Sequence, residues 1–200
     1  MTTIETERPP VGAPTVFTQA QLNWNAWIEP VPEDALSDHQ KDALIDIART
    51  KSPYFRLLAH DPDILKTRTL ADKDIFYNTR DGLPRAEREL AAAAVSRRNG
   101  CIYCASVHAR FATTFSKRHD DVQRLLDEGI GTDIDPLWNA IIEASVALTT
   151  TPIAFRADHV AKLRKLGLGD LAIADLIHAA AFFNWANRLM LSLGEPVRQA

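Results

Sequence analysis

The 200-residue sequence contains only two cysteines, Cys101 and Cys104. Secreted proteins held by disulfides carry more, and these two lie too close together to staple a fold. The longest apolar runs, such as 90–95 and 179–183, fall far short of the ~20 residues that a membrane-spanning helix needs. The polar, proline-bearing N-terminus lacks the charged start and apolar core of a secretion signal. We therefore expect a cytoplasmic protein with no membrane partner.

The chain also lacks a large excess of charge of either sign. The chain has 23 Lys and Arg against 26 Asp and Glu, a net charge of −3, with no basic block of the kind that neutralises phosphates. This balance argues against nucleic acid as a partner. Hydrophobic residues make up 46% and charged residues 24% of the chain, which is typical of a globular protein with a real core. The length is near that of one ordinary domain.

The alternating, β-branched pattern of strands is absent, and helix signals recur instead. Ser or Asp followed by Pro, as at Ser52, Asp61 and Asp135, is typical of a helix start because the side chain caps and proline presets the first turn. We predict an all-α fold. The expected helices are 38–49, 53–59, 62–78, 84–98, 101–117, 120–128, 136–150, 156–166 and 170–193. Expected C-terminal stops are Gly100, Gly129, Gly167 and Gly194.

Residues 1–35 differ from the rest. Prolines come first, and Phe17, Trp24 and Trp27 follow in quick succession. We interpret 1–35 as an N-terminal arm ahead of a single all-helical domain at 36–200. Aromatic side chains favour burial, and the arm could pack on its own chain or on a second subunit.

The most informative segment is a Cys-x-x-Cys followed by a histidine: Cys101, Cys104 and His108. At 3.6 residues per turn these three share one helix face with Phe111 and Phe115, so we expect the thiols to point inward with the phenylalanines. The start of a helix stabilises thiolate and lowers a thiol pKa, most of all at Cys101. His108 lies one turn after Cys104 and is placed to accept its proton.

Two such thiols can carry out a redox cycle. A thiolate attacks a peroxide and becomes a sulfenic acid, the second thiol condenses with it to a disulfide, and an external dithiol resets the pair. Two alternatives stand beside this interpretation. With His108 the cysteines offer three zinc ligands, although no second cysteine or histidine pair follows to complete a tetrahedron. The cysteines could also be inert core residues.

Two glutamates precede this segment on the expected helix 84–98. Glu87 and Glu89 both have small or apolar neighbours one turn on, so either could point into the packed side and relay a proton. Either could equally favour the first helical turn through the helix dipole. Their spacing does not choose between them.

The spacing Glu-x11-Cys-x2-Cys-x3-His is matched by Glu89, Cys101, Cys104 and His108. In this the chain resembles the alkyl hydroperoxide reductase D family within the carboxymuconolactone decarboxylase superfamily, over roughly residues 40–195. The stretch 182–188, Phe-Phe-Asn-Trp-Ala-Asn-Arg, is similar to one in the peroxidase-related subgroup.

The resemblance implies a helical bundle, assembly into homo-oligomers, and a thiol peroxidase that needs no haem, flavin or metal. By similarity, Cys104 attacks the hydroperoxide, Cys101 resolves the sulfenic acid, and Glu89 and His108 relay the proton. The implied reductant is a dihydrolipoyl or thioredoxin-like protein. The best-characterised members have a histidine where this chain has Tyr103, a poor base at neutral pH.

Residues of the last helix could add to the site. His178, Asn184 and Asn187 could donate hydrogen bonds there or satisfy buried backbone, and Arg188 is expected to pair with a carboxylate such as Glu89 or Asp158. An organic hydroperoxide would suit a pocket with aromatic walls. The aromatic residues expected to line it are Phe111, Phe115, Phe182 and Trp185.

Two other functions remain open at this point. One is a superfamily decarboxylase acting on a small lactone acid, although such members generally lack the cysteine pair. The other is a non-catalytic redox sensor or oligomeric binding protein, in which the dithiol switches a conformation.

Overall fold

The computed structural model describes residues 14–78 and 80–198 of the chain. This described part is predominantly helical, which confirms the all-α prediction. Its α-helices are α1 (Asp38–Ala43), α2 (Pro53–Leu58), α3 (Pro62–Tyr77), α4 (Arg85–Asn99), α5 (Ile102–Ser116), α6 (His119–Glu128), α7 (Pro136–Thr149), α8 (Ala157–Lys165) and α9 (Asp170–Leu193). Short 3₁₀ helices span Glu33–Ala35, Ile47–Lys51 and Gly129–Gly131.

Eight predicted helices agree with the structure to within one residue at either end. The exception is 38–49, which is broken: α1 ends at Ala43, Ile45 has a left-handed φ of 64°, and a 3₁₀ turn follows. A β-branched residue with positive φ is rare and has no sequence signature. The caps at Asp61 and Asp135 form as predicted, because their side chains accept backbone N–H groups of the first turn.

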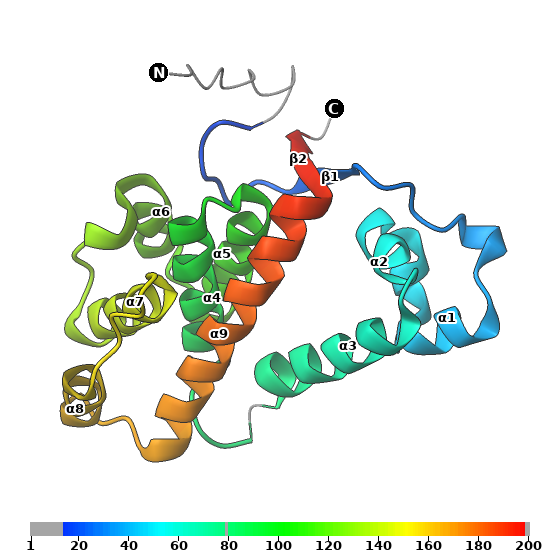
Figure 1. Ribbon diagram of the computed structural model, residues 1–200. Coiled ribbons are helices and arrows are strands. Elements are labelled where there is room, and N and C mark those ends of the chain that lie inside the picture. Colours follow the sequence, from blue (N-terminus) through cyan, green and yellow to red (C-terminus); the bar gives the residue numbers. More distant parts are fainter. Residues whose placement is uncertain (1–13, 79, 199–200) are drawn as a thin grey trace, which may run out of the picture.

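Helix α4 lies at the centre of the fold, surrounded by α5, α7 and α9 (Figure 1). Its residues 90–95, Leu-Ala-Ala-Ala-Ala-Val, are all fully buried. The alanines have no side chain beyond Cβ, so the neighbouring helices approach α4 closely. This packing fixes the C-terminal end of α4, from which the chain turns directly into α5.

Helices α1, α2 and α3 form a second layer beside α9, away from α6, α7 and α8 (Figure 1). A small core of their own holds the layer together, with Leu36, Ala43, Leu44, Ala59 and Leu65 buried against one another. Helix α3 also contacts α4 and α9. The space between this layer and the α5–α9 face therefore has walls from distant parts of the sequence.

The expectation that no strand exists is wrong in one place. Strand β1 (Leu22–Ala26) pairs antiparallel with β2 (Gly194–Arg198), so that Leu22 lies opposite Arg198 and Ala26 opposite Gly194. Gly194 also differs from expectation, because its φ of 172° is extended rather than a left-handed helix stop. A Cβ on Gly194 would lie 2.3 Å from the Trp24 ring, which only glycine avoids. Five-residue strands, one containing glycine and proline, carry little β signal.

Residues 1–13 of the predicted arm lie outside the described residues, and the remainder packs on its own chain. Trp24 is buried and meets the Tyr54 ring edge-on at 5.5 Å between centroids. Gln19 accepts a hydrogen bond from the Thr113 hydroxyl of α5. Trp27 and Ile28, in contrast, are more than half exposed. The described part of the arm therefore contacts α2 through Trp24 and α5 through Gln19.

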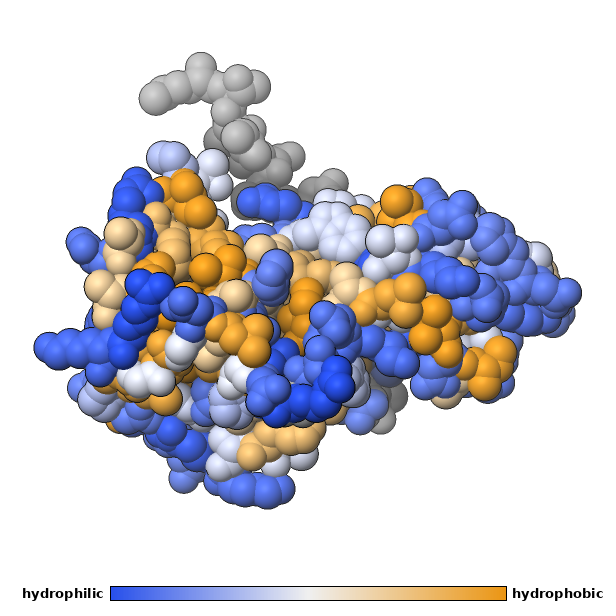
Figure 2. Space-filling view, turned by 90° about the horizontal axis from the view of Figure 1, so that it is seen from below, coloured by the Kyte–Doolittle hydropathy of each residue, from blue (hydrophilic) through white to orange (hydrophobic). Residues whose placement is uncertain are grey.

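Hydrophobic side chains reach the surface in separate patches divided by charged ones on the face shown in Figure 2. Exposed large apolar residues include Ile64, Phe115, Trp185 and Leu191. Within residues 14–78 and 80–198, no helix combines the length and the apolar character needed to cross a bilayer.

Candidate active site

The two cysteines lie at the junction between α4 and α5. Gly100 closes α4 in the left-handed conformation, with φ 79°, and the next residue, Cys101, is the N-cap of α5. Cys104 follows in the first turn. Both are free thiols and both are buried, with exposed fractions of 2% and 5%. Glycine adopts the left-handed conformation without the steric cost of a Cβ. The tight turn that brings the thiols to the start of α5 therefore depends on Gly100.

The thiols titrate as a coupled pair. Hydrogen bonding from the Cys104 thiol lowers the pKa of Cys101 against the opposing effect of burial, and the Cys104 backbone N–H and the Asn187 side chain act in the same direction. The hydrogen bond that the Cys104 thiol donates to Cys101 raises the pKa of Cys104 well above its ordinary value, and burial acts in the same direction. The expectation of a lowered thiol pKa is therefore right for Cys101 and wrong for Cys104.

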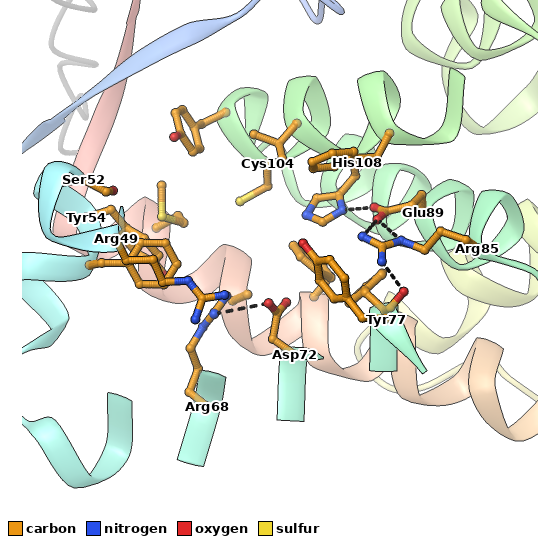
Figure 3. Close-up of a pocket in the computed structure, with 18 residues that line it drawn as sticks. Arg49, Ser52, Tyr54, Arg68, Asp72, Tyr77, Arg85, Glu89, Cys104 and His108 are labelled. Atoms are coloured by element: carbon orange, nitrogen blue, oxygen red, sulfur yellow. Dashed lines mark hydrogen bonds and ion pairs between the residues drawn. The ribbon is translucent and has the colours of Figure 1, made fainter. Parts of the chain in front are cut away.

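Glu89 and His108 are in direct contact across the α4–α5 interface. Nδ1 of His108 lies 2.5 Å from Oε2 of Glu89, and the Arg85 Nε donates to the other carboxylate oxygen at 2.6 Å. Glu89 is fully buried, so its charge is balanced by these partners. Because Nδ1 is engaged by Glu89, Nε2 remains for chemistry, and the ring turns that side toward Cys104 (Figure 3).

The structure distinguishes the two glutamates that the sequence left open. Glu87 accepts a hydrogen bond from the Trp138 indole of α7, on another face of α4. Glu89 alone of the two reaches His108.

A cavity of about 270 Å³ opens between the α2–α3 layer and the α5–α9 face. From α5 it is lined by Tyr103, Cys104 and His108, and its apolar wall includes Phe76 and Phe183. The Phe183 ring packs against the His108 imidazole at 4.0 Å between centroids. Cys104 belongs to the lining, whereas Cys101 lies behind it. A ligand in the cavity therefore meets the Cys104 sulfur first.

The predicted aromatic lining is mostly wrong. Of the four expected residues only Phe111 lines the cavity; Phe115 is 51% exposed and Trp185 is 40% exposed. Position 115 lies one helical turn farther along α5, past the cavity mouth, so the expectation that it points inward also fails. Helical periodicity predicts on which face of a helix a residue lies. It does not predict how far along the helix that face is covered by the neighbouring layer.

Among the cavity residues that the sequence analysis missed are three arginines, Arg49, Arg68 and Arg85. They come from the turn before α2, from α3 and from the start of α4. No local motif marks them. Arg49 and Arg68 reach the cysteines only because the α1–α3 layer folds over α5, and Arg85 reaches the cavity from α4.

Tyr103 lines the cavity beside Cys104. Burial is the main cause that raises its pKa, and the neighbouring Cys104 acts in the same direction. The hydroxyl therefore stays protonated at neutral pH and serves as a hydrogen-bond donor rather than as a base.

Asn187 is the residue of the last helix that meets the cysteines. It is fully buried, donates to Ser96 Oγ at 3.0 Å and accepts from Asn99 at 3.1 Å. It also favours thiolate on the cysteine pair. Asn184 also accepts a hydrogen bond from Asn99, at 3.2 Å, and donates one to Thr149 of α7.

The other predicted residues of α9 lie elsewhere. His178 borders a separate hollow, and Arg188 is exposed. The expected pairing of Arg188 with Glu89 is wrong, because Arg85 of the same helix already occupies that carboxylate. Within the described residues, no three His, Cys, Asp or Glu side chains gather as metal ligands.

Comparison with known proteins gives a consistent picture. The sequence model of the carboxymuconolactone decarboxylase family matches residues 62–144, from α3 into α7. This segment contains Glu89, both cysteines and His108. No curated protein matches the sequence.

Solved structures share the fold. A peroxidase-related protein from Ralstonia eutropha JMP134, described as an alkylhydroperoxidase AhpD core, is 24% identical with a TM-score of 0.69, over 82% of this chain and 88% of that one. A peroxidase-related protein from Silicibacter sp. TM1040 is 20% identical with a TM-score of 0.67, over 96% and 95%. The debrominase Bmp8 is 17% identical with a TM-score of 0.63, over 84% and 90%.

Proposed function

We propose that this chain, which the sequence model of the carboxymuconolactone decarboxylase family matches over residues 62–144, is a thiol-dependent peroxidase that reduces organic hydroperoxides with Cys101 and Cys104. One observation supports this function above the others. Cys104 lines a cavity beside His108, and the far nitrogen of that imidazole is bound by a fully buried carboxylate. A thiol, a base and a residue that orients the base are the parts of an activated nucleophile.

Cys104 is the attacking thiol because it lines the cavity. Its proton passes to His108 Nε2, and the sulfur attacks the terminal oxygen of the hydroperoxide. The O–O bond breaks, Cys104 becomes a sulfenic acid, and the leaving alkoxide takes the proton back from His108 to give an alcohol. Glu89 holds the imidazole in the orientation and charge state that this transfer needs.

Cys101 completes the cycle. Its lowered pKa favours the thiolate, which attacks the Cys104 sulfenic acid; a disulfide forms, and the hydroxide that leaves takes a proton from solvent to give water. The two electrons used in reducing the peroxide are then restored by a dithiol donor protein of the dihydrolipoyl or thioredoxin-like kind. Tyr103 donates a hydrogen bond within the cavity during the attack.

The test follows free thiols and peroxide together by stopped flow, after the fully reduced protein is mixed with one equivalent of cumene hydroperoxide. We expect two thiols to disappear for each peroxide within seconds. Cys104→Ser should abolish consumption, and Cys101→Ser should accumulate a sulfenic acid that dimedone traps. Thiols that stay unreacted for many minutes in the wild type would overturn the proposal.

The same experiment separates the competing functions. A non-catalytic redox sensor would form its disulfide only over hours. A brominated pyrrole serves as the contrasting oxidant, because a variant of the similar debrominase was solved with 2,3,4-tribromopyrrole. Faster thiol loss with the bromopyrrole than with the hydroperoxide would indicate reductive debromination, in which the dithiol replaces bromine by hydrogen and releases bromide. A decarboxylase would consume neither compound.

We also propose that the chain forms a homo-oligomer. Exposed apolar side chains such as Phe115 and Trp185 are surface that a second copy could cover. Light scattering of the reduced protein tests this, and a monomeric mass at micromolar concentration would contradict it.

A further inference from the structure

Arg68 is a buried cation with unused hydrogen-bonding capacity. It lies on α3, its exposed fraction is 8%, and it lines the cavity that contains Cys104. Its Nε and Nη1 atoms have no hydrogen-bond partner within residues 14–78 and 80–198. A buried guanidinium without acceptors is costly, so its presence requires a physical reason.

Neighbouring side chains contact the Arg68 guanidinium without accepting hydrogen bonds from its Nε or Nη1. The guanidinium lies 5.6 Å from the centre of the Phe55 ring and 5.2 Å from that of Phe182. The nearest carboxylate is Asp72, one turn along α3, whose oxygen lies 3.7 Å from Nη1, too far for a hydrogen bond. Two aromatic rings thus flank the guanidinium while its Nε and Nη1 stay without an acceptor.

Arg68 and the reactive thiol share the same cavity. Figure 3 shows the guanidinium reaching in from α3, with Cys104 on the opposite wall. Tyr54 lies beside Arg68, and burial is the main cause that raises its pKa to about 12. Its hydroxyl is therefore protonated at neutral pH and provides one more donor at this end of the cavity.

The charge of the cavity lining favours an anion. Arg49, Arg68 and Arg85 contribute three positive charges against the carboxylates of Asp72 and Glu89. Arg85 is bound to Glu89, and Arg49 donates to the Leu44 carbonyl. Arg68 is the lining cation whose hydrogen bonds are not already committed.

We propose that Arg68 binds the carboxylate of the substrate, so that the cavity selects small organic hydroperoxides that carry an acid group. A guanidinium fork matches a carboxylate with two parallel hydrogen bonds, and the bound acid would satisfy the orphaned donors. The aromatic walls take the organic body of the molecule, and its hydroperoxide lies at Cys104. This substrate class rests on the proposed peroxidase function, whereas acid binding itself does not.

The first test is therefore independent of turnover. para-Isopropylbenzoate and its uncharged amide, neither of which can be reduced, are titrated into the reduced protein by calorimetry. We expect the acid to bind about tenfold more tightly than the amide, because one charge-assisted hydrogen-bonded pair contributes a difference in affinity of this size. Arg68→Gln should remove this preference and Arg68→Lys should keep part of it. Equal binding of acid and amide to the wild type would overturn the proposal without reference to any variant.

Two further variants control for general electrostatics. Lys66→Gln lowers the charge of the same helix equally, but Lys66 pairs with Asp42 outside the cavity, so the preference should persist. Asp72→Asn removes a negative charge beside Arg68 and should tighten acid binding. A preference that survives in folded Arg68→Gln, or that disappears in Lys66→Gln, would contradict a role for Arg68.

The second test compares cumene hydroperoxide with its para-carboxy derivative. We expect kcat/KM to favour the acid by about tenfold in the wild type, and this ratio to approach one in Arg68→Gln. If neither compound is reduced while the benzoate still binds through Arg68, the peroxidase function fails and the acid site stands. If both are reduced equally well, the acid selectivity fails and the peroxidase function stands.

Discussion

His108 of α5 and Glu89 of α4 are joined by a hydrogen bond of 2.5 Å inside the protein, with the carboxylate fully excluded from solvent. This contact connects the two halves of the sequence motif and orients the imidazole toward Cys104. In the interior a charged hydrogen bond is stronger than in water, and its loss is correspondingly costly.

Glu89→Gln tests this contact. We expect the rate of thiol oxidation by cumene hydroperoxide to fall by about a hundredfold, because the imidazole loses the group that orients it. Stability should fall by about 3 kcal/mol, since Arg85 is left buried without its counter-ion. Stopped flow and chemical unfolding measure the two effects.

Glu87→Gln is the matched control for that variant, two residues away on the same helix. Its carboxylate bonds the Trp138 indole and takes no part in the cavity. The rate should stay within about twofold of wild type, as for a change remote from the chemistry. Equal rate losses in both variants would show that α4 stability, and not the His108 contact, sets the rate.

The cysteine pair should titrate in two separated steps. The lowered pKa of Cys101 means that its thiolate is present in the folded protein at pH values where the unfolded chain is still protonated. Its contribution to stability is thus present above the unfolded pKa and is lost as pH falls through the folded one. Ultraviolet thiolate absorbance of the reduced protein should show the first step below the ordinary thiol range.

Cys101→Ser should leave a single step, that of Cys104, shifted downward from its wild-type position because the contribution of Cys101 that raises this pKa is gone and burial alone still raises it. Cys104→Ser should keep a thiolate on Cys101, shifted upward because its strongest hydrogen-bond donor is gone. A first step that persists in Cys101→Ser would place the thiolate on Cys104 instead.

Tyr103→Phe should have a modest effect. Because burial raises its pKa, the phenol does not accept the Cys104 proton, and removing it deletes one hydrogen-bond donor. We expect a rate loss below about tenfold, the scale of a single neutral hydrogen bond. A loss as large as that of Glu89→Gln would make Tyr103 part of the proton relay.

Ala93→Leu tests the packing of α4. Ala93 is fully buried in the alanine run against which other helices pack, and overpacking of such a position typically costs ~1–3 kcal/mol. Ala161→Leu on the exposed face of α8 is the control and should change stability little. Urea unfolding midpoints compare the two.

The elements that could be predicted from sequence are those whose signals are local. Helix starts at Asp61 and Asp135 are specified by a capping side chain and an adjacent proline, so they were predicted correctly. The group of Cys101, Cys104 and His108 follows from the period of one helix, with Gly100 to start the turn.

The parts that could not be predicted depend on contacts between distant segments. Arg68 meets the Cys104 cavity only because the α1–α3 layer folds back over α5. The rise in the pKa of Cys104 follows from the position of Cys101 and from burial, and the spacing of residues in the sequence determines neither. The choice of Glu89 over Glu87 needed the family resemblance, since both lie at the start of α4.

Pairing of β1 with β2 imposes an order on the folding of this protein during synthesis. Residues 22–26 leave the ribosome long before their partners, residues 194–198, are translated. One edge of the strand that contains Trp24 therefore stays unpaired until β2 has emerged. A polypeptide that ends prematurely before residue 194 would keep that edge exposed, so cellular quality control could recognise it by its first strand rather than by its missing end.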